Sequence, residues 1–145
     1  MLDGLVKSDD TDSQLILVPA QSVLSVMPDV EPLLRSAIKR SNGRWEIYDV
    51  IGLILLGHMH LWLSIRDGKP EAAMVTRFNE FPRMKVCFIQ FIGGHDRKRW
   101  LRFQPQIEAW AKANGCSEME TYGRKGWIRV LKDYVVGWTI LRKAL

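Results

Sequence analysis

Apolar residues in the middle of the chain form short runs separated by turn sequences, as in a small β-sheet. Residues 61–66 and 71–78 are two such runs joined by DGKP, a tight-turn sequence that predicts a β-hairpin. A second turn around 81–82 leads into residues 86–92, whose apolar composition is typical of a buried central strand. The pattern therefore predicts a three-stranded antiparallel meander over residues 61–93.

Helical periodicity precedes and follows this meander. Apolar residues recur at helical spacing over 26–40 and 46–56, which predicts two helices, with prolines 28 and 32 in the first turns of the earlier one. The same spacing recurs over 97–114, and Gly115 stands where glycine ends a helix in the left-handed conformation. Pro105 predicts a kink in this helix or a later start.

The two ends of the chain complete the predicted order. Residues 1–14 are acidic and aperiodic, which predicts a flexible arm, and 15–18 form a short strand. Residues 118–122 alternate as a half-buried strand, predicted to run parallel to the central strand because it returns after a helical crossover. A last helix over 124–134 and a final strand over 136–141 are predicted to follow.

Composition adds that this is one globular domain. A chain of 145 residues, 47% hydrophobic and 26% charged, buries a single core. We predict one domain over 15–145 of mixed α/β (α+β) class, with a mostly antiparallel sheet flanked by about four helices. No apolar run is long enough to span a bilayer and no signal pattern precedes the domain. Cys87 and Cys116 fit a reducing compartment, as packing residues.

The net charge then indicates which chemical class of partner to expect. The net charge of +5 favours anionic partners: a phosphorylated cofactor, nucleic acid or a membrane surface. Gly93 and Gly94, followed by the basic turn HDRKR and a helix, form a unit whose backbone N–H groups can hold a phosphate. The alternative is that the glycines only turn the chain. His58 and His60 lack a third ligand nearby in the sequence, so no metal site is predicted.

The predicted order of elements resembles the GNAT superfamily of acyl-CoA-dependent N-acetyltransferases over residues 61–145. Within 107–134, IEAWAKANGC followed by GRKGWIRVLKDY resembles divergent GNAT-like proteins of bacteriophages and prophages. The resemblance implies the GNAT fold, acetyl-CoA as cofactor, and a location in the host cytoplasm or the virion.

The resemblance also implies which residues contact the cofactor. In GNAT enzymes the central strand binds the pantetheine arm, which falls here on Gln90, Phe91 and Ile92. The family's Q/R-x-x-G-x-G/A phosphate loop places His95 at its first position, but Lys98 and Trp100 stand where glycines are expected. The replacement that the sequence offers is a set of neighbouring residues, namely Gly93, Gly94, Arg97, Lys98 and Arg99.

Two catalytic residues follow from the same comparison. Glu120 lies on the strand that enters the active-site cleft in this family, where it is the candidate base, directly or through a water; the alternative is a solvent-facing carboxylate. The family's N-x-x-A-x-x-x-Y pattern falls on Arg124, Trp127 and Leu131, so its tyrosine acid is absent. Tyr134, one turn further on, is the replacement acid or, alternatively, a core residue.

Three functions remain open at this point. The first is acyl transfer from acyl-CoA to an amine. The second is a catalytically silent GNAT fold that serves as a phage component or binds a phage or host protein. The third is nucleic-acid binding through the basic residues of 97–102 and 124–129, beside Trp100 and Trp127.

Overall fold

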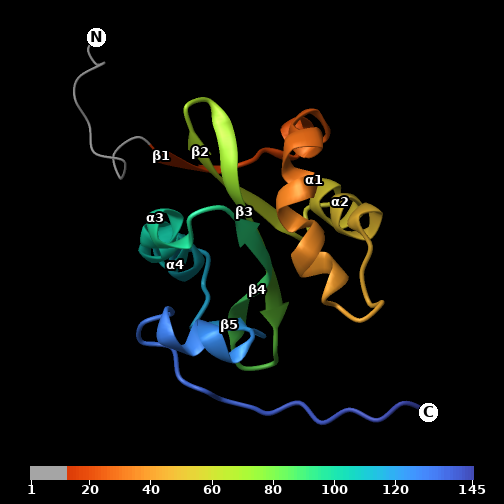
Figure 1. Ribbon diagram of the computed structural model, residues 1–145. Coiled ribbons are helices and arrows are strands. Elements are labelled where there is room, and N and C mark those ends of the chain that lie inside the picture. The colour runs from red at the N-terminus through yellow and green to blue at the C-terminus, as the bar shows by residue number, and fades with distance from the viewer. Residues whose placement is uncertain (1–12) are drawn as a thin grey trace.

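The computed structural model describes residues 13–145 (Figure 1). The N-terminal arm predicted for residues 1–14 lies outside the described residues up to position 12. The elements, in chain order, are β1 (Ser13–Leu17), η2 (Ala20–Ser22), α1 (Val23–Lys39), α2 (Ile47–Leu55), β2 (His60–Arg66), β3 (Lys69–Glu80), β4 (Lys85–Gly94), α3 (Arg97–Trp100), η3 (Leu101–Phe103), α4 (Gln104–Ala113), β5 (Glu118–Thr121) and η4 (Lys125–Arg129).

One five-stranded sheet organises the domain, with the strand order β1-β2-β3-β4-β5. All neighbouring strands are antiparallel except β4 and β5, which are parallel. The predicted meander and the parallel return strand are thus confirmed, and so is the mixed, mostly antiparallel fold class. The first strand starts at Ser13, two residues before its predicted start.

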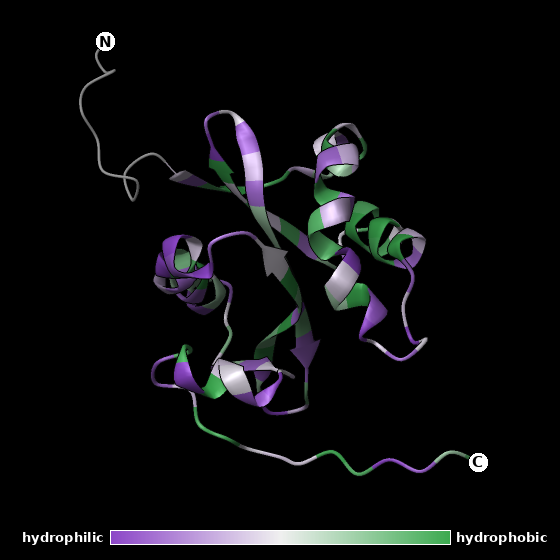
Figure 2. Cartoon of the chain, viewed as in Figure 1, coloured by the Kyte–Doolittle hydropathy of each residue, from purple (hydrophilic) through white to green (hydrophobic). Residues whose placement is uncertain are grey.

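Helices cover both faces of the sheet (Figure 1). α1 and α2 pack on one face, which we call the α1 face, around Leu34, Val75 and Phe91. α3 and α4 cover the opposite face, the α4 face, around Trp62 and Ile107. Figure 2 shows hydrophobic residues running along α1, α2 and the strands, where the two halves of the core meet the sheet.

The position of two prolines in α1 differs from the prediction. The helix begins at Val23, so Pro28 and Pro32 lie in its interior and not in its first turns. Each proline lacks an N–H and leaves a carbonyl one turn earlier without its helical partner. Burial of the apolar face, including Val30 and Leu34, which are fully buried, holds the helix despite this loss.

The helical stretch after β4 is divided as Pro105 predicted. A single turn, α3, leads through η3 into α4, and Pro105 occupies the first turn of α4, where its missing N–H has no helical partner to lose. Gly115 follows with a φ of 89°, which confirms the left-handed end of this helix.

The C-terminal predictions were wrong in two places. Instead of a helix over 124–134, only the 3₁₀ segment η4 forms. Residues 136–141 form no strand within the described part of the chain, because no neighbouring strand pairs with them. No helix within residues 13–145 has the length and apolar composition needed to cross a membrane.

Candidate functional site

A gap opens where β4 and β5 part. β5 pairs with β4 from Val86 to Ile89, whereas β3 stays paired with β4 as far as Gly94. The hydroxyl of Thr121 donates a hydrogen bond to the carbonyl of Ile89 at 3.0 Å, at the last paired position. Beyond it, residues 90–94 of β4 have no strand on the side of β5, so their backbone groups on this edge face the gap.

A β-bulge lies at the start of this gap. Ile89 pairs with Thr76 and Phe91 pairs with Val75, so Gln90 is the extra residue on β4. The side-chain oxygen of Gln90 is buried and receives no hydrogen bond from any described residue. A buried acceptor in this condition costs about 1–3 kcal/mol. An N–H group that reached this oxygen would be stabilised by it, but Gln90 is not among the residues that line the space left in the gap.

Segments from both sides narrow the gap. Ile89, Ile92, Thr121 and Tyr122 line it from the strands, and Trp127 and Leu131 close it from the C-terminal segment on the α4 face. The space that remains is about 20 Å³, room for one water. Trp127 and Leu131 occupy the positions where the family pattern has a small residue and a tyrosine, so this side of the gap is filled by bulky side chains.

The structure gives Gly93 and Gly94 a packing role. A Cβ on Gly93 would overlap the carbonyl oxygen of Leu33 in α1. Gly94 has a φ of 149°, and a Cβ there would lie 2.6 Å from Cα of Ala72 in β3. Both glycines allow a neighbouring backbone to approach β4 closely.

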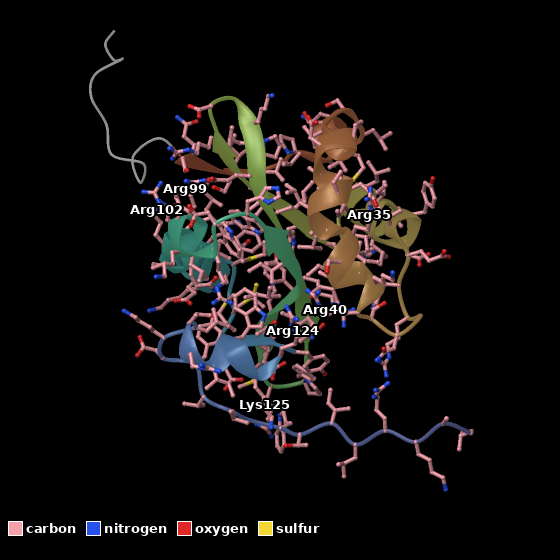
Figure 3. All side chains as sticks on the ribbon, viewed as in Figure 1. Arg35, Arg40, Arg99, Arg102, Arg124 and Lys125 are labelled. Atoms are coloured by element: carbon pink, nitrogen blue, oxygen red, sulfur yellow. The ribbon has the colours of Figure 1, made fainter. Side chains whose placement is uncertain are left out.

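The basic turn after β4 is only partly free to meet a ligand. His95, Arg97 and Lys98 are exposed, whereas Arg99 is partly buried. Arg99 forms an ion pair with Glu71, with 2.8 Å between Nη2 and Oε1, and a second with Asp96 at 3.1 Å. Figure 3 labels Arg99, which is itself a residue of α3. Arg97 lies over the ring of Trp127, 5.3 Å from the ring centroid.

Glu71 is the centre of a buried polar cluster. Its Oε2 accepts hydrogen bonds from the hydroxyls of Ser13 at 2.6 Å and Ser64 at 2.7 Å, and the residue is only 7% exposed. Burial acts to raise the pKa of Glu71, but hydrogen bonds from Ser13, Ser64 and Arg99 outweigh burial and hold this pKa below its usual value. The cluster joins β1, β2, β3 and α3. Sequence patterns did not indicate this cluster, because its members are far apart along the chain.

Glu120 lies on the α1 face of the sheet. It is in register with Phe88 of β4, and its neighbour Met119 packs into the core of the α4 face, so the two side chains point to opposite sides. Tyr122 contacts Phe88 edge-to-face at 4.8 Å, and the guanidinium of Arg77 lies 5.6 Å from the same ring. Tyr122 and Arg77 thus both pack on Phe88, the residue of β4 that is in register with Glu120.

Tyr134, the predicted acid, lies against α4 and not beside Glu120. Its hydroxyl accepts a hydrogen bond from the amide of Gln104 at 2.8 Å and donates one to Glu108 at 2.9 Å, both on α4. Burial and the Glu108 carboxylate raise the pKa of Tyr134 well above its usual value, which makes it a weaker acid. The structure therefore does not bring Tyr134 and Glu120 together.

His60 and the two cysteines have local packing partners, whereas His58 is exposed. Nδ1 of His60 lies 3.1 Å from the hydroxyl of Thr76, and its ring contacts Phe78 and Trp110. Within residues 13–145, no three His, Cys, Asp or Glu side chains are grouped for a metal ion. Burial raises the pKa of Cys87 to about 12, so its thiol stays protonated at neutral pH.

Similarity to known proteins lies in the fold and not in the sequence. No family model matches the chain, and no curated protein sequence matches it. An aminoglycoside acetyltransferase from an uncultured soil metagenomic sample, solved with sisomicin, superposes with a TM-score of 0.67 at 10% identity, covering 94% of this chain and 100% of that one.

Two further structures give the same result. A GNAT family acetyltransferase from Staphylococcus aureus has a TM-score of 0.62 at 14% identity, covering 92% of this chain and 99% of its own. An aminoglycoside N-acetyltransferase in complex with CoA has a TM-score of 0.64 at 12% identity, covering 91% of this chain and 94% of its own. The fold of this chain is therefore that of the GNAT acetyltransferases.

Proposed function

We propose that the chain binds an acyl-CoA in the gap between β4 and β5 and transfers the acyl group to an amine. The observation that carries this proposal is the bulge at Gln90, where β4 parts from β5 and leaves a buried acceptor without a donor. The likeness in fold to acetyltransferases, one of them solved with CoA, supports the choice of ligand.

In this proposal, different residues around the gap bind different parts of the ligand. The free edge of β4 at Gln90, Phe91 and Ile92 would bind the amide-containing pantetheine arm by backbone hydrogen bonds, together with the side chain of Gln90. The exposed cations Arg97 and Lys98, with His95, would meet the phosphates. Bound acetyl-CoA supplies an activated thioester.

Three residues of the predicted phosphate site have a positioning role in this proposal. Arg99 fixes α3 to β3 through Glu71, and Gly93 and Gly94 hold the turn close to α1 and β3. The turn therefore binds phosphate with fewer backbone groups than a glycine-rich loop would offer, and relies more on side-chain charge.

In this proposal Glu120 accepts the proton of the amine. It lies on the α1 face, opposite the side that Trp127 closes, so an amine reaching the gap from this face meets a carboxylate. A positioned carboxylate that accepts the amine proton contributes about 100-fold or more to the rate. Tyr134 does not protonate the leaving thiolate in this proposal, because its hydroxyl is hydrogen-bonded to residues of α4.

The test is acetyl transfer to a panel of amines, followed by mass spectrometry. We expect Glu120→Gln to lower the turnover number by about 100-fold while the affinity for acetyl-CoA is unchanged. Glu80→Gln, at an exposed position at the end of β3, is the matched control and keeps full turnover. Equal turnover of Glu120→Gln and the wild type would overturn the role of Glu120.

A second candidate function is favoured by Trp127 and Leu131, which fill the α4 side of the gap. In this case the chain keeps the GNAT fold without turnover, as a virion component or a protein that binds a phage or host partner. The resemblance of residues 107–134 to GNAT-like phage proteins supports this alternative. Acetyl-CoA binding separates the two candidates, because a silent fold needs no affinity for it.

A further inference from the structure

An arginine and a glutamate stand in one row across the sheet, with a phenylalanine between them. Phe88 of β4 is in register with Arg77 of β3 on one side and with Glu120 of β5 on the other. Residues in register on neighbouring strands point to the same face, so all three side chains lie on the α1 face. Neighbouring strands are about 4.8 Å apart, which puts the backbones of Arg77 and Glu120 about 10 Å apart.

The positive charge of Arg77 has no counterion. Its guanidinium lies over the Phe88 ring, and its Nε is buried without a hydrogen-bond acceptor. Within residues 13–145, Arg77 makes no hydrogen bond or ion pair. The side chain is only partly buried, and its two Nη atoms are not among the buried groups that lack a partner, so solvent reaches them. These nitrogens offer a planar fork of donors to a carboxylate.

Glu120 is the matching anion on β5. It is partly buried, and within the described part of the chain it makes no hydrogen bond or ion pair, so it does not neutralise Arg77. It comes one residue before Thr121, the last position at which β5 pairs with β4. The sheet therefore carries a separated positive and negative charge next to the point where the gap opens.

The surface between the two charges is aromatic. Phe88 is only 3% exposed, because Arg77 and Tyr122 pack on its ring. Tyr122 is itself 71% exposed, so its ring is open to an apolar group. A ligand that fits this surface carries two opposite charges and an apolar part.

We propose that this surface of the α1 face binds a free α-amino acid with an apolar side chain as the acceptor, its carboxylate on Arg77 and its amine on Glu120. The proposal rests on the function proposed above and names its substrate. Two charge-assisted hydrogen bonds of about 2.8 Å, with about 3 Å between the nitrogen and the nearer carboxylate oxygen, span about 9 Å, close to the separation of the two rows. A polyamine would instead place a second cation beside Arg77.

The two charged residues have different roles in the transfer. The ammonium gives one proton to Glu120, the nitrogen bonds to the acyl carbon, and the bond between this carbon and sulfur breaks. A second proton leaves the nitrogen with the thiolate, which is released as the thiol, and the proton on Glu120 passes to water. Arg77 holds the carboxylate throughout and exchanges no proton. Its removal should therefore raise KM and leave kcat unchanged.

Acetyl transfer to phenylalanine, leucine and methionine, each compared with its primary amide, tests the acceptor. The amide keeps the amine and the side chain but lacks the carboxylate, so the wild type should have a KM about tenfold to 100-fold lower for the acid. Arg77→Met keeps an apolar stem over Phe88 and should raise the KM for the acid to that for the amide. Arg83→Met, in the exposed turn between β3 and β4, is the matched control and keeps the wild-type KM.

The comparison of acid with amide in the wild type decides the proposal even if Arg77→Met fails to fold. Equal KM values for the acid and the amide, with all three amino acids, overturn the amino-acid site and leave acyl transfer to other amines intact. Preferred transfer to spermidine overturns it in the same way.

Titration calorimetry with the same acids and amides, in the presence and absence of CoA, separates the binding site from the transfer reaction. An acid that binds to the wild type, with its amide and the Arg77→Met variant showing no binding, supports the site even if no acetyl group is transferred. In that case only the proposed transfer fails. A wild type that neither binds nor acetylates any of the three amino acids overturns the site.

Discussion

At the scale of single residues, Gln90 and Gly93 show how β4 combines close packing with an unsatisfied polar group. Gln90 is the extra residue of the bulge and keeps an acceptor without a donor. Gly93, three positions on, touches the carbonyl of Leu33 so closely that no side chain fits. The close packing of α1 fixes one end of the exposed edge and the bulge fixes the other.

Gly93→Ala tests this packing. The added Cβ would overlap the Leu33 carbonyl, which belongs to a helix backbone and has little room to move, so we expect a loss of roughly 3 kcal/mol in the free energy of unfolding. Gly52→Ala is the matched control, because Gly52 lies inside α2 with nothing within 4 Å of its Cβ position. Urea unfolding should show a gain of about 0.5–1 kcal/mol for the control. Equal effects of the two changes would contradict the packing role.

The glycines also show what the sequence alone misses at this scale. A glycine pair before a basic turn favours an anion site, and the sequence pointed to this role for Gly93 and Gly94. Their packing partners, Leu33 and Ala72, become visible only when the tertiary structure is known. Glu71 is the same case, since a glutamate within a strand pattern is expected at the surface, whereas here it is buried beside Ser13, Ser64 and Arg99.

At the scale of elements, α3 is attached to the sheet by Arg99 while its neighbours are exposed. Arg99 is therefore a structural cation, whereas Arg97 and Lys98 face solvent. We expect substitution of Arg99 to affect stability, and substitution of Arg97 and Lys98 to affect ligand binding.

Arg99→Ala should unfold at a lower temperature. Removing the guanidinium leaves Glu71 buried with only two hydroxyl partners, a loss of about 3 kcal/mol that corresponds to a decrease of roughly 10 °C in the melting temperature. Arg97→Ala/Lys98→Ala should leave the melting temperature almost unchanged and weaken acetyl-CoA binding. Scanning calorimetry measures the first effect and titration calorimetry the second. A melting temperature unaffected by Arg99→Ala would contradict the role of the ion pair.

Most elements could be predicted from the sequence, and the failures lie in one region. The meander, the helix end at Gly115 and the parallel return of β5 follow from local periodicity and turn residues, which the tertiary structure did not override. Over 124–134 the apolar spacing indicated a helix, but only η4 forms. Trp127 and Leu131 instead line the gap between β4 and β5. The strand pattern of 136–141 is present without a partner strand.

At the scale of the whole molecule, the buried Glu71 cluster links stability to pH. Hydrogen bonds to the ionised carboxylate lower the pKa of Glu71 in the folded state below its unfolded value. The carboxylate therefore stabilises the fold at every pH above about 4.3, the usual glutamate pKa. This contribution is lost as the pH falls through the lowered pKa of the folded state.

Comparison of the wild type with Glu71→Gln tests this linkage. We expect the variant to be less stable at pH 7, and the difference in the free energy of unfolding to shrink as the pH falls below about 4. Glu80→Gln, at an exposed position, should match the wild type throughout. A difference between wild type and Glu71→Gln that stays constant down to pH 2 would show that the cluster does not stabilise the ionised form.

Of the residues predicted to contact the cofactor, Ile92 lines the gap between β4 and β5, and Arg97 and Lys98 are exposed in the turn that follows β4. Their roles toward a cofactor stay predictions. The pairing of Tyr134 with α4 and the closure of the gap by Trp127 depend on contacts across the fold and needed the structure.

The central claim is that the gap at Gln90 binds an acyl-CoA, and titration calorimetry with acetyl-CoA tests it most directly. The wild type should bind with a micromolar dissociation constant. Gln90→Met, which keeps the volume but removes the buried acceptor, should weaken binding about tenfold through loss of one hydrogen bond. Absence of any binding by the wild type at near-millimolar acetyl-CoA would contradict the claim and leave the silent fold as the function.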